Sequence, residues 1–207
     1  MKAILEQIVA DAILHAKWLN TLSFMENAGA RKISACEDPL NTDLIQLKHA
    51  AEEHRHAYYL KKQIGKLGIE GFEFYNESSL IGGKASVQYL HRLDVKTSRY
   101  LKEQFNLTGQ ELRYAAYLFV TYAIEVRADE LYPIYQEVLT SVGSKVMVKS
   151  IILEEEGHLE EMISQLKGFD PEWEVHAERV LLVETELFHQ WISEVSKEVE
   201  LCDVHNR

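Results

Sequence analysis

The sequence predicts an all-α protein. Its only prolines are Pro39, Pro133 and Pro171, and long stretches between them repeat apolar residues every three or four positions. No segment has the strict alternation of apolar and polar residues that is typical of a half-buried strand. The 207 residues, of which 46% are hydrophobic, are enough for a single domain over 1–207 with a sizeable core.

The first half of the chain predicts two long helices and a crossover. Helices are expected over about 2–33 and 41–67, separated by the turn Ser-Ala-Cys-Glu-Asp-Pro at 34–39. The segment 68–83 holds four glycines and an aromatic cluster, so we expect a crossover loop there. A less regular helix over about 85–105 follows it.

The second half predicts three more helices. Thr108 and Glu111 match a capping box, which opens a helix over about 109–139 that Pro133 is expected to kink or end locally. A turn at 141–144 leads into a helix over about 144–167. Asp170 and Pro171 fit an N-cap and first helical position, and so predict a last helix over about 172–200.

The charge balance limits the classes of partner. Lysine and arginine number 22 and aspartate and glutamate 33, a net charge of −11, so neither a nucleic-acid nor an anionic-membrane surface is expected. Cys36 and Cys202 are too few for a disulfide framework, which favours a reducing cytoplasm. Acidic Glu6 and Asp11 and the lack of a long apolar stretch argue against a signal peptide or membrane span.

The motif Glu-x-x-His carries the candidate chemistry. Residues three apart share a helix face, so a carboxylate and an imidazole can reach one metal ion. Chance alone gives about one such pair in this composition, whereas the sequence has three. They are Glu53/His56, Glu155/His158 and Glu186/His189.

Helical projection separates these three pairs. At 100° per residue, Glu53 and Glu155 lie within core-facing apolar stripes with their histidines beside them. Glu186 and His189 point away from the apolar stripe of the last helix, as expected of a chance motif on a solvated face. Two further acids, Glu26 and Glu125, also lie on apolar stripes. Four inward carboxylates with two inward imidazoles need cations, because unpaired buried charge costs several kcal/mol.

The spacing of the four acids is consistent with a single layer. Glu26 and Glu53 are equidistant from residue 39.5, within the turn between the first two predicted helices. Glu125 and Glu155 are equidistant from residue 140, beside the turn at 141–144. In an antiparallel hairpin such residues lie at the same height, roughly 20 Å from the turn. Two hairpins packed together would therefore bring six ligands into one layer.

The pattern Glu26, Glu53-His54-Arg55-His56, Glu125 and Glu155-Glu156-Gly157-His158 resembles the ferritin-like di-iron carboxylate superfamily over about residues 1–168. The resemblance implies a four-helix bundle of two antiparallel hairpins, with an extra helix in the crossover and a C-terminal helix. It implies two metal ions, Fe or a Mn/Fe pair, bridged by Glu53 and Glu155. Glu26 with His56 would hold one ion, and Glu125 with His158 the other.

The resemblance also implies outer partners for the two histidines. An acid precedes each bridging glutamate, and in this superfamily such an acid often accepts the N–H of the opposite ligand histidine. We expect Glu52 near His158 and Glu154 near His56, the alternative being two solvated acids. Three tyrosines, Tyr114, Tyr122 and Tyr132, flank Glu125. Tyr122 is the candidate for a catalytic tyrosine, the alternative for all three being core packing. Two other inward residues, His15 and His49, are interpreted as hydrogen-bonded core histidines, whereas Glu184 pairs with a base or lies near the metals.

Three functions follow. The first is an oxygen-activating oxidoreductase that uses dioxygen or peroxide on a small or hydrophobic substrate entering near Tyr122 and Pro133. Its electron donor and a homodimeric state are left open. The second is ferroxidase and iron handling, against which stands the long crossover. The third is a metal-free bundle, which elemental analysis would separate from the other two.

Overall fold

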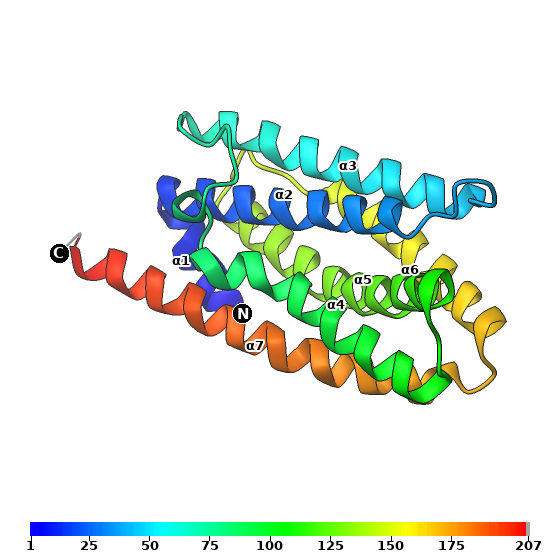
Figure 1. Cartoon of the computed structure of the whole chain (residues 1–207). Coiled ribbons are helices and arrows are strands. Elements are labelled where there is room, and N and C mark those ends of the chain that lie inside the picture. The colour runs from blue at the N-terminus through cyan, green and yellow to red at the C-terminus, as the bar shows by residue number, and fades with distance from the viewer. Residues whose placement is uncertain (206–207) are drawn as a thin grey trace.

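The computed structural model describes residues 1–205, and every regular element in that range is helical, which confirms the all-α prediction (Figure 1). None of these helices has an apolar stretch that could cross a bilayer. Two short 3-10 helices lie at Gly65–Leu67 and Glu77–Ser79. The α-helices are α1 (Lys2–Ala10), α2 (Ala12–Ala35), α3 (Leu44–Ile64), α4 (Gly83–Phe105), α5 (Gly109–Ser141), α6 (Lys149–Phe169) and α7 (Trp173–His205).

Two antiparallel hairpins form the centre of the bundle. Helix α2 packs against α3 and α5 against α6, and these are the two most extensive helix pairings. The hairpins face each other, α2 toward α5 and α3 toward α6. This arrangement places the middle of all four helices in one layer, as the equidistance of the acids from the turns predicts.

Helices α4 and α7 cover one side of the two hairpins. They run antiparallel to each other below α5 in the view of Figure 1, and both pack against it. Their shared core is aromatic: the Trp18 and Trp191 rings are stacked with centroids 5.7 Å apart, and the Tyr89 ring is stacked on Trp191 at 5.5 Å. The two added helices therefore belong to the same core as the hairpins.

The first predicted helix, 2–33, is wrong as one continuous element. Asp11 has extended backbone (φ −109°, ψ 119°) and separates α1 from α2. Its carboxylate accepts hydrogen bonds from the backbone N–H groups of Ile13 (2.8 Å) and Leu14 (2.9 Å), so it caps α2. The apolar period continues across the break, which is why the stripe alone did not reveal it.

Helix α5 also differs from the prediction. It continues through Pro133 to Ser141, and therefore the proline does not end it. Thr108 is the residue before the first turn, but its side chain makes no capping hydrogen bond, so the capping box is not formed. The glycine that follows, Gly109, has φ +57°, which alters the geometry that a capping box needs.

The last two helices begin later than predicted. The chain over 144–148 is not helical, since the backbone N–H groups of Met147 and Val148 are held by the side chains of Gln63 (3.3 Å) and Gln136 (2.8 Å). Asp170 ends α6 rather than capping α7, which begins at Trp173 and extends beyond residue 200.

Candidate metal centre

The six side chains that the sequence singled out as metal ligands lie together in the middle of the two hairpins. Each of the four hairpin helices contributes one carboxylate, and α3 and α6 each add an imidazole. All are buried except Glu26, which is half-buried. The set is Glu26 from α2, Glu53 and His56 from α3, Glu125 from α5, and Glu155 and His158 from α6.

These side chains form two overlapping groups of possible ligand atoms. The first group is Glu26, Glu53, His56 and Glu155, and the second is Glu53, Glu125, Glu155 and His158. Within each group the ligand atoms all lie within 4.8 Å of one another. Glu53 and Glu155 belong to both groups. The cluster can therefore hold a metal ion, and two of its carboxylates are common to both groups.

A carboxylate on the neighbouring hairpin orients each histidine. The Nε2 atom of His56 lies 2.7 Å from Glu154, and that of His158 lies 2.7 Å from Glu52. Both contacts are those predicted. Because an ionised carboxylate can only accept, Nε2 of each ring must carry the hydrogen. In the neutral imidazole, Nδ1 then presents its lone pair to the cluster, as a metal ligand must.

The inner atoms of the cluster lack hydrogen-bond partners. Nδ1 of His56, Nδ1 of His158 and Oε1 of Glu155 are buried and unpartnered. His56 Nδ1 lies 3.0 Å from Glu155 Oε1 without the alignment of a hydrogen bond. Leaving buried polar atoms unpaired costs about 1–3 kcal/mol each. Acceptor atoms that converge in this way without a donor are the arrangement that a cation satisfies.

Bound protons partly neutralise the negative charge of the cluster when no metal ion is bound. Burial alone lowers the pKa of a histidine, but the neighbouring carboxylates, chiefly Glu155, raise the pKa of His56 to about 9. Glu125 and Glu155 outweigh burial in the same way and raise the pKa of His158 to about 11. Burial, and then the charges of Glu26 and Glu155, raise the pKa of Glu53 well above its ordinary value. Protons and metal ions therefore compete for the same atoms.

Arg55, to which the sequence assigned no role, holds Glu154, one of the two acids that orient the histidines. The Arg55 guanidinium donates two hydrogen bonds to Glu154, both 2.8 Å. It also lies 3.4 Å from Glu52 on its own helix. Arg55 stands between the two histidines of the sequence Glu-His-Arg-His, but its partner is on α6, so only the packing of the hairpins reveals the contact.

The tyrosine that contacts the cluster is Tyr132, not Tyr122. Tyr132 is buried and its hydroxyl donates a hydrogen bond to Glu26. Tyr122 packs edge-to-face against Trp173, with ring centroids 5.7 Å apart, and the structure does not bring it to the ligands. Helical phase explains the difference, because Tyr132 lies about 20° from Glu125 around α5 and Tyr122 about 60°.

Each of the other inward residues has a partner in the core. The His15 ring lies 2.6 Å from the Tyr135 hydroxyl, and the His49 ring lies 2.9 Å from Glu161. Both agree with the interpretation as hydrogen-bonded core histidines. Buried Glu184 accepts two hydrogen bonds from the Arg127 guanidinium, at 2.9 and 2.7 Å, and so takes the first of its two alternatives, a basic partner.

The third Glu-x-x-His pair lies apart from the cluster, as the helical projection predicted. Glu186 and His189 are both exposed on α7. Glu186 accepts a hydrogen bond from Gln190 at 3.0 Å and lies 3.6 Å from Lys96. This pair is therefore an internal control for the two buried pairs.

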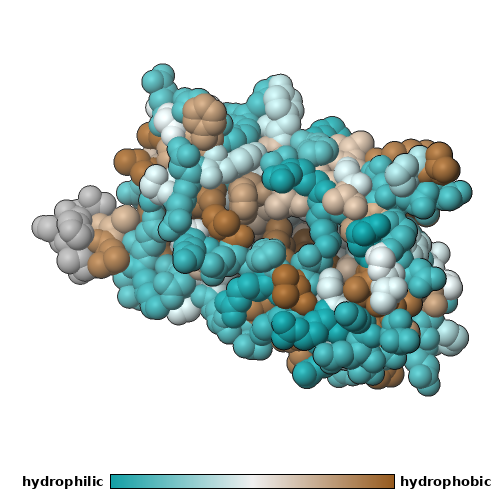
Figure 2. Space-filling view, in the orientation of Figure 1, coloured by the Kyte–Doolittle hydropathy of each residue, from teal (hydrophilic) through white to brown (hydrophobic). Residues whose placement is uncertain are grey.

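A cavity of about 260 Å³ extends from the cluster to the surface. It lies between α2, α4 and α5 and reaches four of the six candidate ligands: Glu26, Glu53, Glu125 and Glu155. Figure 2 shows apolar side chains in a recess between α2 and α4, bordered by hydrophilic ones. Neither Tyr122 nor Pro133 lines this cavity. The cavity is therefore not the substrate entry that was expected near those two residues.

No protein-family model, curated protein or solved structure matches the chain.

Proposed function

We propose that this protein is a dinuclear metal protein of the ferritin-like type, a di-iron or Mn/Fe oxidoreductase that activates oxygen. The observation that carries the proposal is the pair of overlapping ligand groups, which share Glu53 and Glu155. One buried cation would need only one such group. Two groups with two shared carboxylates match the ligand pattern of di-iron carboxylate proteins.

The donor set fits two divalent ions. Four carboxylates carry −4 and two neutral imidazoles carry none, so two divalent cations bring the cluster to neutrality. Mixed carboxylate and imidazole ligation suits iron and manganese, whereas zinc sites of structural type use thiolates that the cluster lacks. The unpartnered Nδ1 atoms of His56 and His158 point to the same conclusion, because the ions would satisfy them.

The residues of the chain have distinct tasks in this proposal. Glu26 and His56 would serve one ion and Glu125 and His158 the other, with Glu53 and Glu155 shared. Glu154 and Glu52 hold each imidazole with Nδ1 inward, through their contacts with Nε2. The Tyr132 hydroxyl donates a hydrogen bond to Glu26, so it holds this carboxylate in place and keeps a proton next to it. A bound iron or manganese pair supplies electrons for the reduction of dioxygen or peroxide.

The cavity favours an enzyme over an iron store. A path for ions needs polar groups that replace their hydration, whereas this cavity, which reaches four of the carboxylates, is lined mainly by apolar side chains. An organic molecule that enters it would lie against the ligands of both proposed ions. Size-exclusion chromatography tests the alternative, since an iron-storing shell elutes at several hundred kilodaltons and a monomeric or dimeric enzyme does not.

Metal content is the direct test. Protein loaded with Fe(II) without oxygen and freed of excess metal should retain two ions per chain by elemental analysis, and should then consume oxygen in an electrode cell. Glu53→Ala and Glu155→Ala remove a shared ligand, so both should abolish dinuclear loading.

The third motif supplies the matched control. Glu186→Ala removes a glutamate from an exposed Glu-x-x-His pair on α7 and should leave the metal content unchanged. Near-zero iron, manganese and zinc in the wild-type protein would overturn the proposal, and so would equal losses from all three substitutions.

A further inference from the structure

One residue of the cavity wall is a glycine in the middle of a helix. Gly29 lies on α2, one turn after Glu26, and lines the cavity. A Cβ atom at Gly29 would meet no atom within 4 Å. Its backbone has no positive φ, so the conformation does not require glycine. A residue with a Cβ atom, such as alanine, could therefore occupy this position without backbone strain and without a clash at that atom.

Glycine at this position nevertheless costs stability. In a helix interior it is less favourable than alanine by roughly 0.5–1 kcal/mol, because it loses more conformational freedom on folding. No neighbouring atom explains its presence by close packing. The remaining difference between Gly29 and a larger residue is the open space that a side chain would fill, and that space is the cavity.

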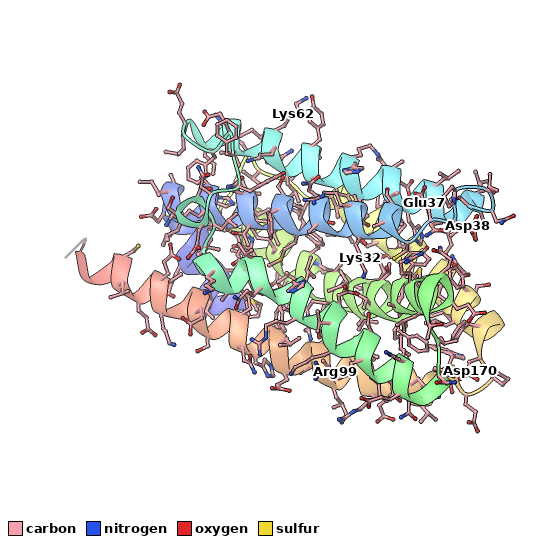
Figure 3. All side chains as sticks on the ribbon, viewed as in Figure 1. Lys32, Glu37, Asp38, Lys62, Arg99 and Asp170 are labelled. Atoms are coloured by element: carbon pink, nitrogen blue, oxygen red, sulfur yellow. The ribbon has the colours of Figure 1, made fainter. Side chains whose placement is uncertain are left out.

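The lining residues differ in exposure along the cavity. Val87 and His91 on α4 are exposed and Gly29 on α2 is half-buried, whereas Glu53 and Glu125 are buried, so the cavity opens between α2 and α4. Lys32, the next residue along the same face of α2, reaches toward α4 and pairs with Asp94 (Figure 3). Gly29 thus lies between the surface ion pair at Lys32 and the candidate ligand Glu26.

Apart from the carboxylates of the candidate metal centre at its inner end, which two divalent ions would neutralise, the cavity wall has its charged groups paired. Lys32 is neutralised by Asp94, and Arg127 by Glu184 at 2.7 Å. Most of the remaining wall is aliphatic, from residues such as Leu22, Ile33, Val120, Ile124, Ala128 and Leu131. With the carboxylates neutralised by metal, an ionised molecule would lose its hydration here without gaining a partner, whereas an apolar one gains by leaving water.

We propose that the cavity binds an uncharged, apolar small molecule and that Gly29 keeps its entrance open. The volume of about 260 Å³ lies just below the usual range for drug-sized ligands and suits a molecule of one ring or a short chain. This inference rests on the proposed function only in that it makes the bound molecule the substrate, placed against the carboxylates of the metal centre.

Toluene is a suitable probe, with benzoate and benzylamine as charged analogues of similar shape. Isothermal titration calorimetry should show saturable toluene binding to Zn(II)-loaded and to metal-free protein. Both charged analogues should bind much more weakly to the Zn(II)-loaded protein, in which the ions neutralise the carboxylates of the wall. Gly29→Phe should weaken toluene binding by roughly tenfold to a hundredfold, the factor that burying one phenyl ring supplies.

Gly168→Phe is the matched control. Gly168 is also a helical glycine at which a Cβ atom would meet nothing within 4 Å, but it is exposed on α6 and does not line the cavity. This variant should bind toluene within twofold of the wild type. Should Gly29→Phe fail to fold, Gly29→Leu tests the same point. Gly29→Ala should retain binding and raise the melting temperature, because glycine is not needed by the fold.

The outcomes separate this inference from the proposed function. No toluene binding, tighter binding of a charged analogue to the Zn(II)-loaded protein, or equal losses in the Gly29 and Gly168 variants would overturn the inference, even if two metal ions bind. Toluene binding that depends on Gly29 in a protein that takes up no metal would support the cavity as a binding site and overturn the dinuclear centre.

Discussion

Glu52 on α3 and His158 on α6 are joined across the two hairpins by a 2.7 Å contact between Oε2 and Nε2. Glu154 on α6 and His56 on α3 repeat the contact in the opposite direction, also at 2.7 Å. Each hairpin thus supplies the acid that orients the imidazole of the other. The docking of the two hairpins and the orientation of the ligands are therefore set by the same pair of contacts.

The first prediction concerns this reciprocal pair. Glu52→Ala should weaken the binding of one metal ion about 10- to 100-fold, because the His158 ring loses the acceptor that fixes its tautomer and its orientation. Competition between the protein and a chelator for Mn(II) measures the change. Glu154→Ala should have a similar effect through His56.

Glu160, an exposed glutamate on the same helix as Glu154, serves as the control for these two variants. Glu160→Ala removes a charge from the surface of α6 and should leave both Mn(II) affinities within twofold of the wild type. If Glu160→Ala weakened binding as much as Glu52→Ala does, the effect would come from net charge rather than from the oriented histidine.

The candidate ligands could be predicted from sequence because two independent constraints select the same residues. Helical phase placed Glu53 and Glu155 among core residues, and equidistance from the turns placed Glu26 opposite Glu53 at the same height. Both constraints depend only on helix geometry, which varies little from protein to protein. The exposed pair at Glu186 failed the first test, and it lies on the surface.

Other features of the fold and the site depend on contacts between side chains that the apolar periodicity of the sequence does not predict. The break at Asp11 arises from one side chain that caps α2, while the apolar stripe continues past it. The contact of Tyr132 with Glu26 depends on how α5 faces α2, and the cavity depends on how α4 lies across both helices. Such features require the packing angles between helices, which the sequence pattern leaves open.

The two tyrosines give a second prediction. Tyr132→Phe removes the hydroxyl that donates to Glu26, and a hydrogen bond to a charged group contributes about 1.5–3 kcal/mol. The ion served by Glu26 and His56 should therefore bind roughly 10- to 100-fold more weakly, whereas the other ion should be little affected. Anomalous scattering from crystals grown with limiting Mn(II) reports the occupancy of each position.

Tyr122→Phe is the corresponding control, because the Tyr122 ring packs on Trp173 away from the ligands. Its two Mn(II) occupancies should equal those of the wild type. A loss of occupancy at either position in Tyr122→Phe would show that Tyr122 acts on the centre after all.

A third prediction concerns the pH dependence of stability. Burial lowers the pKa of His15 to about 4, whereas the unfolded chain has the ordinary value near 6.5. Below pH 6.5 the unfolded state therefore takes up a proton that the folded state refuses until about pH 4. The free energy of unfolding should fall across this window, by up to about 3 kcal/mol from His15 alone.

His15→Gln tests this dependence, since glutamine can still reach the Tyr135 hydroxyl but does not titrate. Urea unfolding of metal-free wild type and variant, at half-unit steps from pH 7 to pH 4.5, measures the difference. The wild type should lose more stability than the variant as the pH falls. Parallel curves would mean that His15 titrates alike in both states.

The last prediction uses the conflict between binding and stability at Glu53. This carboxylate is buried beside Glu26, Glu125 and Glu155, and burial is the first cause that raises its pKa. In the metal-free protein its charge opposes folding, more strongly as the pH rises above 4.5, the ordinary value for glutamate. A residue kept at such a cost needs a compensating partner, and the proposed ions supply one.

Glu53→Gln should therefore have opposite effects on stability in the two states of the protein. It should stabilise the metal-free protein, and it should remove most of the stabilisation that bound metal gives. Without metal, the neutral amide should raise the free energy of unfolding by about 1–4 kcal/mol, and more at pH 8 than at pH 5. With Mn(II) at a hundred times its dissociation constant, the wild type should gain about 2.7 kcal/mol per bound ion, and the variant should gain little. Thermal unfolding with and without Mn(II) gives both results. A variant less stable than the wild type under both conditions would show that Glu53 is held by internal partners, not by a cation.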